Sequence, residues 1–318
     1  MYSFINLFSL AIVWGLFFSL ARFAGESGIP KTSLITCVTV LDVIAFLAIC
    51  RFRGIYPKLR RSSFIFYGVC ALFGYLLPMQ LELYAAPIIG AGLLTMLVSL
   101  TPVITMMIAL AIGDEHVSRS RIAGILLAVV AMLPLFYQDL SAASFDGTDR
   151  IIAMCAALVV ACCYGIYHNY IAVKWPDGED GWQLATGEAI ACSAMMMPIL
   201  IIMGGADLHL LADFTASWVI VAYVVLSVSS IYLYFYLIKL GGAVYVSMAG
   251  FLTLGFGVGF GIWLFDERYP WWVALCVAGL MGATFLASRK ADSPDDDPQD
   301  RLEDDPQESD KTPSEKPI

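Results

Sequence analysis

The stretch YAAPIIGAGLLTMLVSLTPVITMMIALAIGDE occupies residues 84–115, and YLIKLGGAVYVSMAGFLTLGFGVGFGIWLFDE occupies residues 236–267. The two align without a gap at an offset of 152 residues, with eight identities in 32 positions. Both stretches contain a Gly-Ala pair and end with an Asp-Glu pair at the same spacing: Gly90-Ala91 and Gly242-Ala243, then Asp114-Glu115 and Asp266-Glu267. Shared residues at a fixed spacing indicate an internal duplication.

The composition of the chain is that of a membrane protein. Its 318 residues include only 14% charged residues, and its mean hydropathy is +0.78, outside the range of soluble domains. A hydrocarbon core about 30 Å thick needs roughly 20 apolar residues in a helix. The sequence therefore predicts an all-α polytopic membrane protein with ten transmembrane helices, at about 4–23, 33–50, 63–83, 90–112, 121–138, 151–173, 183–203, 216–238, 242–264 and 271–288.

The basic residues predict the orientation of these helices. An even number of spans leaves both termini on one side of the membrane. Of the lysines and arginines in residues 1–290, eleven fall on the side of the termini and four on the other. Five of the eleven lie in the loop RFRGIYPKLRR at 51–61. By the positive-inside rule we expect both termini in the cytoplasm and a multi-pass protein of the cell (inner) membrane.

The offset of the repeat predicts that its two copies are inverted. It contains five predicted helices, an odd number, so the second copy crosses the membrane in the opposite sense. Inverted repeats are typical of secondary transporters, whose substrate site lies near the midplane between the halves. We therefore expect two five-helix repeats, 1–140 and 141–290, followed by a tail, 291–318. The tail contains eleven acidic and three basic residues and is predicted to be disordered, because it has almost nothing apolar to bury.

These residues also carry a resemblance to a known family. A Gly-Ala start, an apolar helix with a proline in its middle (Pro102), an acidic corner and a helix containing Gly124 resemble the EamA-type domain of the drug/metabolite transporter superfamily. The second copy departs from this pattern, since Leu254 stands where Pro102 would repeat and the helix is rich in glycine. The resemblance implies ten helices in two EamA domains around a central cavity with alternating access.

Three carboxylates lie within predicted spans and are candidates for ion coupling. Charge in lipid is costly, so an ionisable residue within a span is a functional hypothesis by default. Asp42 lies deepest, in the middle of VTVLDVIAFL, while Glu82 and Glu188 lie nearer to span ends. Asp42 could carry a proton, or it could be a structural carboxyl at a helix contact. The resemblance favours the structural role, because the second helix of such proteins is usually peripheral to the cavity. Glu82 and Glu188 could instead simply reach an interface.

Polar and aromatic side chains within the spans are the candidates for substrate binding. Each combines an apolar body with a polar handle, which suits a small metabolite, although helix packing explains them nearly as well. His168 lies one helical turn beyond Tyr164 and could shuttle protons, or be solvated at the helix end. The substrate-binding candidates are Trp14, Tyr75, Gln80, Tyr164, His168, Tyr232 and Tyr236.

The sequence favours a secondary transporter over other classes. It contains no HExxH, GxSxG or P-loop motif, so we expect no enzymatic activity, no catalytic residues, no metal and no cofactor. No basic footprint for nucleic acid is present. The expected partners are a small-molecule substrate, such as an amino acid or related amphipathic solute, and membrane lipid. Proton or ion coupling and a homodimer are left open. The predicted function is transport by alternating access, in the export direction; the alternatives are a channel or lipid scramblase, and last an intramembrane enzyme.

Overall fold

Over the part of the chain that the structure describes, the regular secondary structure is all helical. The computed structural model describes residues 2–58, 60–113, 119–142, 148–202 and 213–288. Its helices are α1 (Tyr2–Glu26), α2 (Lys31–Arg53), α3 (Arg61–Cys70), the π-helix η1 (Ala71–Leu76), α4 (Leu77–Ile89), α5 (Ala91–Val98), α6 (Thr101–Ile112), α7 (Arg119–Ala142), α8 (Thr148–Lys174), α9 (Gly181–Ile202), α10 (Phe214–Ser247), α11 (Ala249–Phe265) and α12 (Trp272–Ser288).

These helices coincide with the predicted spans. Seven helical stretches are long and apolar enough to cross a membrane, and two shorter apolar ones, Ile122–Ala131 and Ala249–Phe265, lie within α7 and α11. The predicted all-α polytopic class is therefore confirmed. Three of the predicted spans are each made of more than one helix: α3, η1 and α4 form the third, α5 and α6 form the fourth, and the end of α10 together with α11 forms the ninth.

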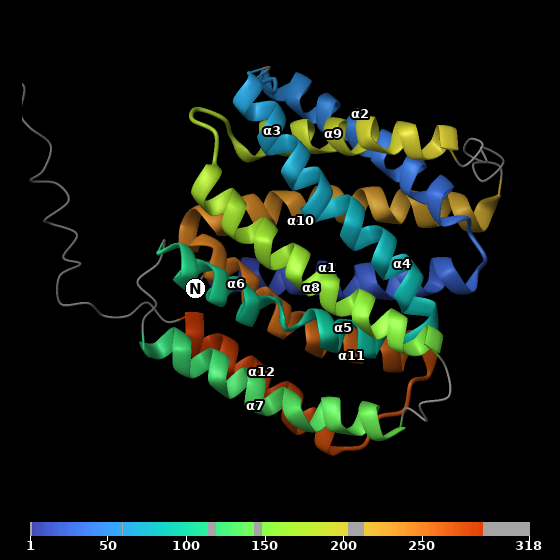
Figure 1. Ribbon diagram of the computed structural model, residues 1–318, viewed down its shortest axis with the longest axis vertical. Coiled ribbons are helices and arrows are strands. Elements are labelled where there is room, and N and C mark those ends of the chain that lie inside the picture. Colours follow the sequence, from blue (N-terminus) through green and yellow to red (C-terminus); the bar gives the residue numbers. More distant parts are fainter. Residues whose placement is uncertain (1, 59, 114–118, 143–147, 203–212, 289–318) are drawn as a thin grey trace, which may run out of the picture.

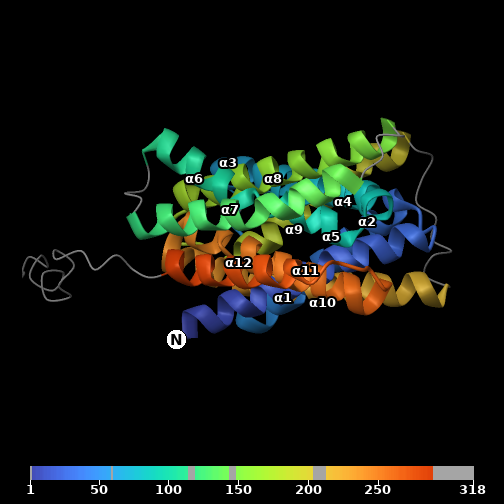
Figure 2. The ribbon, with the colours of Figure 1, turned by 90° about the horizontal axis from the view of Figure 1, so that it is seen from below.

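The helices lie side by side as a bundle whose two ends carry the connecting loops (Figures 1 and 2). In Figure 1, α2, α3 and α9 form the upper edge and α7 and α12 form the lower edge. Helices α1, α4, α5, α6, α8, α10 and α11 lie between these edges. The centre of the bundle is therefore built from helices of both sequence halves.

Helix partners recur when the halves are exchanged. Helix α1 packs on α10 and α11, which form the eighth and ninth spans, while α8 packs on α4 and α6 of the third and fourth spans. Helix α2 packs on α9, and α7 packs on α12. If each span is replaced by the span five places further along the chain, with the first following the tenth, every one of these pairs becomes another pair of the set or the same pair. The same arrangement of neighbours is thus built twice.

Two glycines that match in the repeat share an unusual backbone conformation. Gly90 has φ 84° and ψ 158° before α5, and Gly242 has φ 74° and ψ −175° inside α10. This region of backbone space is essentially restricted to glycine. The identity of Gly90 and Gly242 in the sequence therefore has a structural cause, because each permits a sharp change of direction between two spans.

The glycine-rich ninth span is continuous where the sequence is richest in glycine. Helix α11 runs unbroken through Gly250, Gly255, Gly257, Gly259 and Gly261, and the interruption falls earlier, at Met248. The glycines instead allow close approach: a Cβ added at Gly257 would collide with Thr95 of α5. At Gly257 the glycine therefore serves close packing of α11 against α5.

Two of the sequence predictions lie outside the described residues. They are the corner formed by Asp114 and Glu115 and the acidic tail, 291–318. The second copy of the corner is described, and there Asp266 ends α11 in a left-handed conformation with φ 53°.

Candidate functional site

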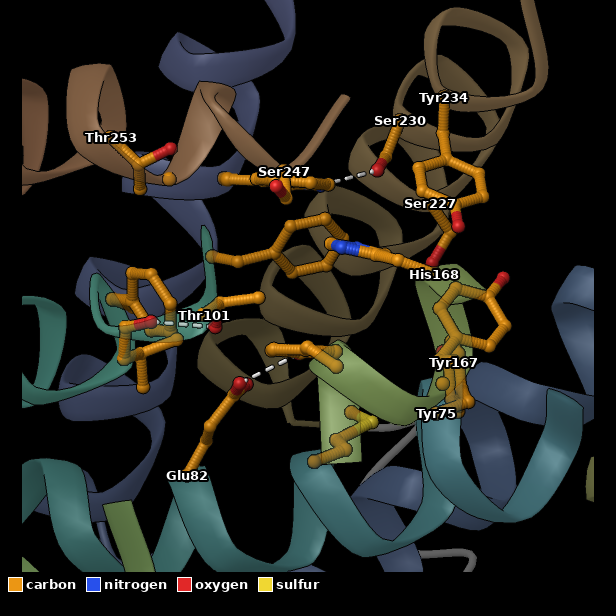
Figure 3. A pocket seen from close by; sticks show the side chains of 18 of the residues that line it. Tyr75, Glu82, Thr101, Tyr167, His168, Ser227, Ser230, Tyr234, Ser247 and Thr253 are labelled. Carbon is orange, nitrogen blue, oxygen red and sulfur yellow. Dashed lines mark hydrogen bonds between the residues drawn. The ribbon is translucent and has the colours of Figure 1, made fainter. Parts of the chain in front are cut away.

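A cavity of about 120 Å³ lies in the centre of the bundle. It is lined from both halves of the sequence, by residues of α1, η1, α4, α5, α6, α8, α9, α10 and α11 (Figure 3). Thr101 and Thr253, which match in the repeat, both line it. Because most of the lining is aromatic or aliphatic and a few polar groups converge on it, the cavity has the character of a small-molecule site.

One wall of the cavity is a stack of aromatic rings. Trp14 of α1 lies parallel to His168 of α8, with ring centroids 6.1 Å apart and planes 8° apart. His168 in turn stacks on Tyr164 at 6.4 Å and 11°, as their spacing of one helical turn predicts. Nε1 of Trp14 donates to Oγ of Ser230, at 2.9 Å, which fixes the indole against α10. The wall is therefore positioned by three helices.

Two carboxylates face the cavity, and a tyrosine of α8 donates to each. The Tyr164 hydroxyl donates to Oε1 of Glu82 at 2.7 Å, and the Tyr167 hydroxyl donates to Oε2 of Glu188 at 3.0 Å. Glu82 is 7% exposed and Glu188 is 4% exposed. Both line the cavity, so neither reaches an interface, which was the alternative weighed for them. Figure 3 shows Glu82 extending from α4 toward the cavity.

Asp42 lies behind the cavity wall and does not line it. It is buried in α2, and Oδ2 accepts a hydrogen bond of 2.9 Å from the Tyr75 hydroxyl. Tyr75 itself lines the cavity from η1. A π-helical turn shifts the direction of the side chains that follow it and is frequently found at functional sites. Asp42 is therefore connected to the cavity through one tyrosine, and α2 is peripheral, as the family resemblance implies.

A close approach of two helices fixes the position of Tyr167. Gly74 of η1 lies against the Tyr167 ring, and a Cβ at Gly74 would collide with that ring. The ring also stacks on Tyr234 of α10, with centroids 5.4 Å apart and planes 18° apart. The glycine thus lets Tyr167 reach both Glu188 and Tyr234 from α8.

Three of the sequence candidates do not line the cavity. Gln80 is half-buried on α4, outside the lining. Tyr232 and Tyr236 lie on the outer face of α10, 53% and 42% exposed, and stack on each other. They do share a helix face, as their spacing indicates, but that face points away from the cavity. We therefore do not retain these three residues as substrate-binding candidates.

The inward face of α10 was missed by the sequence analysis. Tyr223, Ser227, Ser230 and Tyr234 all line the cavity. They recur at i, i+4, i+7 and i+11, which is one face of an α-helix. This polar stripe in an apolar span was a readable signal. Tyr232 and Tyr236, the residues predicted instead, lie on the opposite face of the same helix.

An ion pair lies at the end of the bundle where α1 and α11 finish. Nη1 of Arg22 donates to Oε1 of Glu267, and the Tyr269 hydroxyl donates to Oε2 of Glu267 at 2.5 Å. Nε of Arg22 also bonds Glu26, at 2.6 Å. Oε1 of Glu267 lies 3.2 Å from the position that a Cβ would take at Gly90. This cluster joins the first, fourth and ninth spans at one end.

The fold and the site together define a class of protein. A polytopic bundle with a buried cavity lined by both sequence halves, and with its spans joined at one end by an ion pair, is the architecture of a membrane transporter.

Comparison with known proteins agrees and is more specific. Residues 1–137 match the model of the EamA-like transporter family. The first 137 residues are therefore similar to an EamA-like transporter domain, the type of domain found in the drug/metabolite transporter superfamily. One crystal structure, described only as that of a protein, is similar to this chain with a TM-score of 0.67 and 15% sequence identity, covering 91% of this chain and 98% of the other. That likeness shows the fold alone. No curated protein matches the sequence significantly.

Proposed function

We propose that this protein is a secondary transporter that moves a small amphipathic metabolite across the cell (inner) membrane by alternating access, in the export direction. The observation that carries the proposal is the central cavity, because both halves of the sequence contribute to it and matched threonines, Thr101 and Thr253, line it. In a duplicated transporter, the interface between the halves is where the substrate binds.

The division into halves is part of the proposal. We assign residues 1–140 to the first repeat and 141–290 to an inverted second repeat. The exchange of helix partners and the shared backbone conformation of Gly90 and Gly242 support this assignment. A movement of one half against the other would change access to the cavity without rebuilding either half.

The ion pair of Arg22 and Glu267 suits a contact that closes one end. It joins α1 to the segment between α11 and α12 and is reinforced by Tyr269. With both termini in the cytoplasm, this end would face outward, and the ion pair would close the bundle to the outside. Opening outward then requires the pair to separate.

The orientation is tested by labelling single cysteines in a variant without the eight native cysteines. The two substitutions are Tyr56→Cys, in the loop between α2 and α3, and Ser27→Cys, in the loop between α1 and α2. Both positions are exposed. In intact cells an impermeant thiol reagent should label position 27 and not position 56. The reverse pattern would contradict cytoplasmic termini.

Coupling and assembly complete the proposal. Asp42, Glu82 and Glu188 are the candidates for proton coupling, since each is a buried carboxylate with a tyrosine donor. A homodimer and the coupling ion stay predictions. A channel or a lipid scramblase is the alternative function, and an intramembrane enzyme is the least favoured one.

The proposed function is tested by counterflow. Proteoliposomes with the purified protein are loaded with a small-molecule extract of the host cell, and release is followed by mass spectrometry after the same extract is added outside. We expect saturable exchange of a small set of compounds that empty liposomes do not show. Release that is unsaturable and independent of external solute would indicate a channel, and scrambling of labelled lipid without solute exchange would indicate a scramblase.

A further inference from the structure

The central cavity contains two carboxyl groups without a positively charged partner. Glu82 and Glu188 line it, and no lysine or arginine is among the residues that do. Among the described residues, the ion pairs of the chain both involve Arg22, whose partners are Glu26 and Glu267. The carboxylates of the cavity are therefore left with hydrogen bonds alone.

Those hydrogen bonds are too few to compensate a buried charge. An ionised carboxylate has about four acceptor sites, and one tyrosine hydroxyl donates to each of these two. A buried charge is strongly unfavourable unless it is paired and hydrogen-bonded. A cation entering the cavity would supply the missing partner, so the site is built to gain from a positively charged ligand.

The walls of the cavity suit the same ligand. Trp14, Tyr164, Tyr167, Tyr223 and Tyr234 all line it. The faces of tryptophan and tyrosine rings attract cations, and more strongly where water is excluded. The same rings accommodate an apolar body. The cavity volume is about 120 Å³, so the ligand is small.

Two buried polar atoms of the lining have no hydrogen-bond partner among the described residues. They are Nδ1 of His168 and the Tyr234 hydroxyl oxygen. His168 is 2% exposed, and Figure 3 shows it between α8 and the serines of α10. Buried polar atoms are nearly always paired. Each of these atoms can accept a hydrogen bond, which suits the N–H groups of an amine.

Several backbone N–H groups at the helix breaks beside the cavity are already hydrogen-bonded within the chain. Broken helices in transporters often present free N–H groups to a substrate carboxylate. Here, at the break between α5 and α6, the N–H of Leu100 donates to Leu97 and that of Val103 donates to Leu100. At the break before α11, the N–H of Phe251 donates to Met248. A carboxylate on the ligand would meet Glu82 and Glu188 with no cation opposite it.

We propose that the solute bound in this cavity is a small organic cation, an amine or quaternary ammonium with an apolar body, whose charge is neutralised by Glu82 and Glu188. This inference rests on the proposed transport function and narrows its substrate class. It favours amines over amino acids, because an amino acid adds a carboxylate that the lining does not recognise.

The inference is tested with matched ligands on the purified full-length protein. Phenethylamine is a cation at pH 7.4, 2-phenylethanol is its neutral counterpart, and L-phenylalanine adds a carboxylate. Choline and 3,3-dimethylbutan-1-ol form a second pair of cation and neutral analogue. Affinity is measured by calorimetry in detergent micelles. We expect a cation of either set to bind at least tenfold more tightly than its uncharged or zwitterionic counterpart.

Substitutions locate the effect. Glu82→Gln and Glu188→Gln should each weaken cation binding by about 30-fold or more, as loss of one partner of a buried charge pair does. Glu179→Gln is the matched control, since Glu179 is 4% exposed and accepts from Ser63 and Tyr67, yet lies outside the cavity lining. Melting curves of each variant show whether it is folded, and the control should bind cations normally.

Each outcome separates the inference from the transport function. Equal binding of amine and alcohol, tighter binding of L-phenylalanine, or no binding of either cation overturns the cation proposal. In the counterflow experiment, exchange of only zwitterions or anions would also overturn it while leaving the transport function intact. Absence of any saturable exchange would contradict the transport function itself.

Discussion

Two sets of carboxylates in this protein have different environments. Glu267, at the end of the bundle, has a guanidinium, a tyrosine hydroxyl and tight packing against Gly90 and Gly92. Glu82 and Glu188, in the centre, each have one tyrosine. The first carboxylate is compensated by the chain itself, whereas the other two are not. From this difference we infer that Glu267 holds helices together, whereas Glu82 and Glu188 bind a positively charged group of the ligand.

The largest effect on stability is expected at the compensated carboxylate. Arg22→Met removes the cation and leaves Glu267 partly buried without it, and side chains of this pair are 18% and 16% exposed. We expect a loss of about 2–4 kcal/mol in the free energy of unfolding, measured by SDS titration in micelles. The double variant with Glu267→Gln should recover part of this loss. Additive losses would contradict a direct coupling between the two residues.

The central carboxylates should respond in the opposite sense. Glu82→Gln or Glu188→Gln replaces a buried group lacking a positive partner with a neutral one of the same shape. Stability without ligand should stay the same or rise, by up to about 2 kcal/mol, while cation binding falls. The same titration measures stability, with Glu267→Gln as the contrasting variant. A comparable loss of stability in all three variants would remove the distinction drawn between the two sets.

A smaller effect is expected where Glu267 packs on the start of α5. A Cβ at Gly92 would collide with the Tyr269 hydroxyl and lie 2.9 Å from Oε2 of Glu267. Gly92→Ala should therefore cost about 1–3 kcal/mol, as overpacking does. Gly259→Ala is the control, because Gly259 is helical and has nothing within 4 Å of an added Cβ. The melting temperature of Gly92→Ala should be lower than that of Gly259→Ala. Equal melting temperatures would argue against tight closure at this end.

The smallest effect is expected on the outer face of α10. Tyr232→Phe and Tyr236→Phe remove hydroxyls from exposed rings, so both stability and ligand binding should change by less than about 0.5 kcal/mol. Tyr164→Phe removes the donor to Glu82 and should alter cation binding. Calorimetry compares the three variants. Loss of binding in Tyr232→Phe would restore that residue as a candidate for the site.

Much of this fold was readable from the sequence. Hydropathy over windows of span length predicted where the helices lie, because lipid requires long apolar helices. The Gly90 and Gly242 identity predicted a shared feature, and the structure gives both the same backbone conformation. The internal breaks of the spans, at η1 and at Met248, were not predicted, because they depend on packing between helices rather than on local composition.

The site was only partly readable. Trp14, Tyr75, Tyr164, His168, Glu82 and Glu188 were named from polar groups in apolar spans, and the structure brings all six to one cavity. Tyr232 and Tyr236 were named for the same reason, yet they point outward. Membrane helices can be apolar on every side, so a single tyrosine does not mark the face directed inward. On α10 the recurrence of Tyr223, Ser227, Ser230 and Tyr234 along one face does mark it.

The most direct test of the central claim is a crystal structure of the protein grown with 4-bromophenethylamine, in which anomalous scattering from bromine fixes the orientation of the ligand. We predict that the ligand occupies the central cavity, with its nitrogen within hydrogen-bond distance of Glu82 or Glu188 and its ring against the aromatic wall of Trp14. A ligand whose nitrogen points away from both carboxylates, or an empty cavity at saturating ligand concentration, would contradict the account.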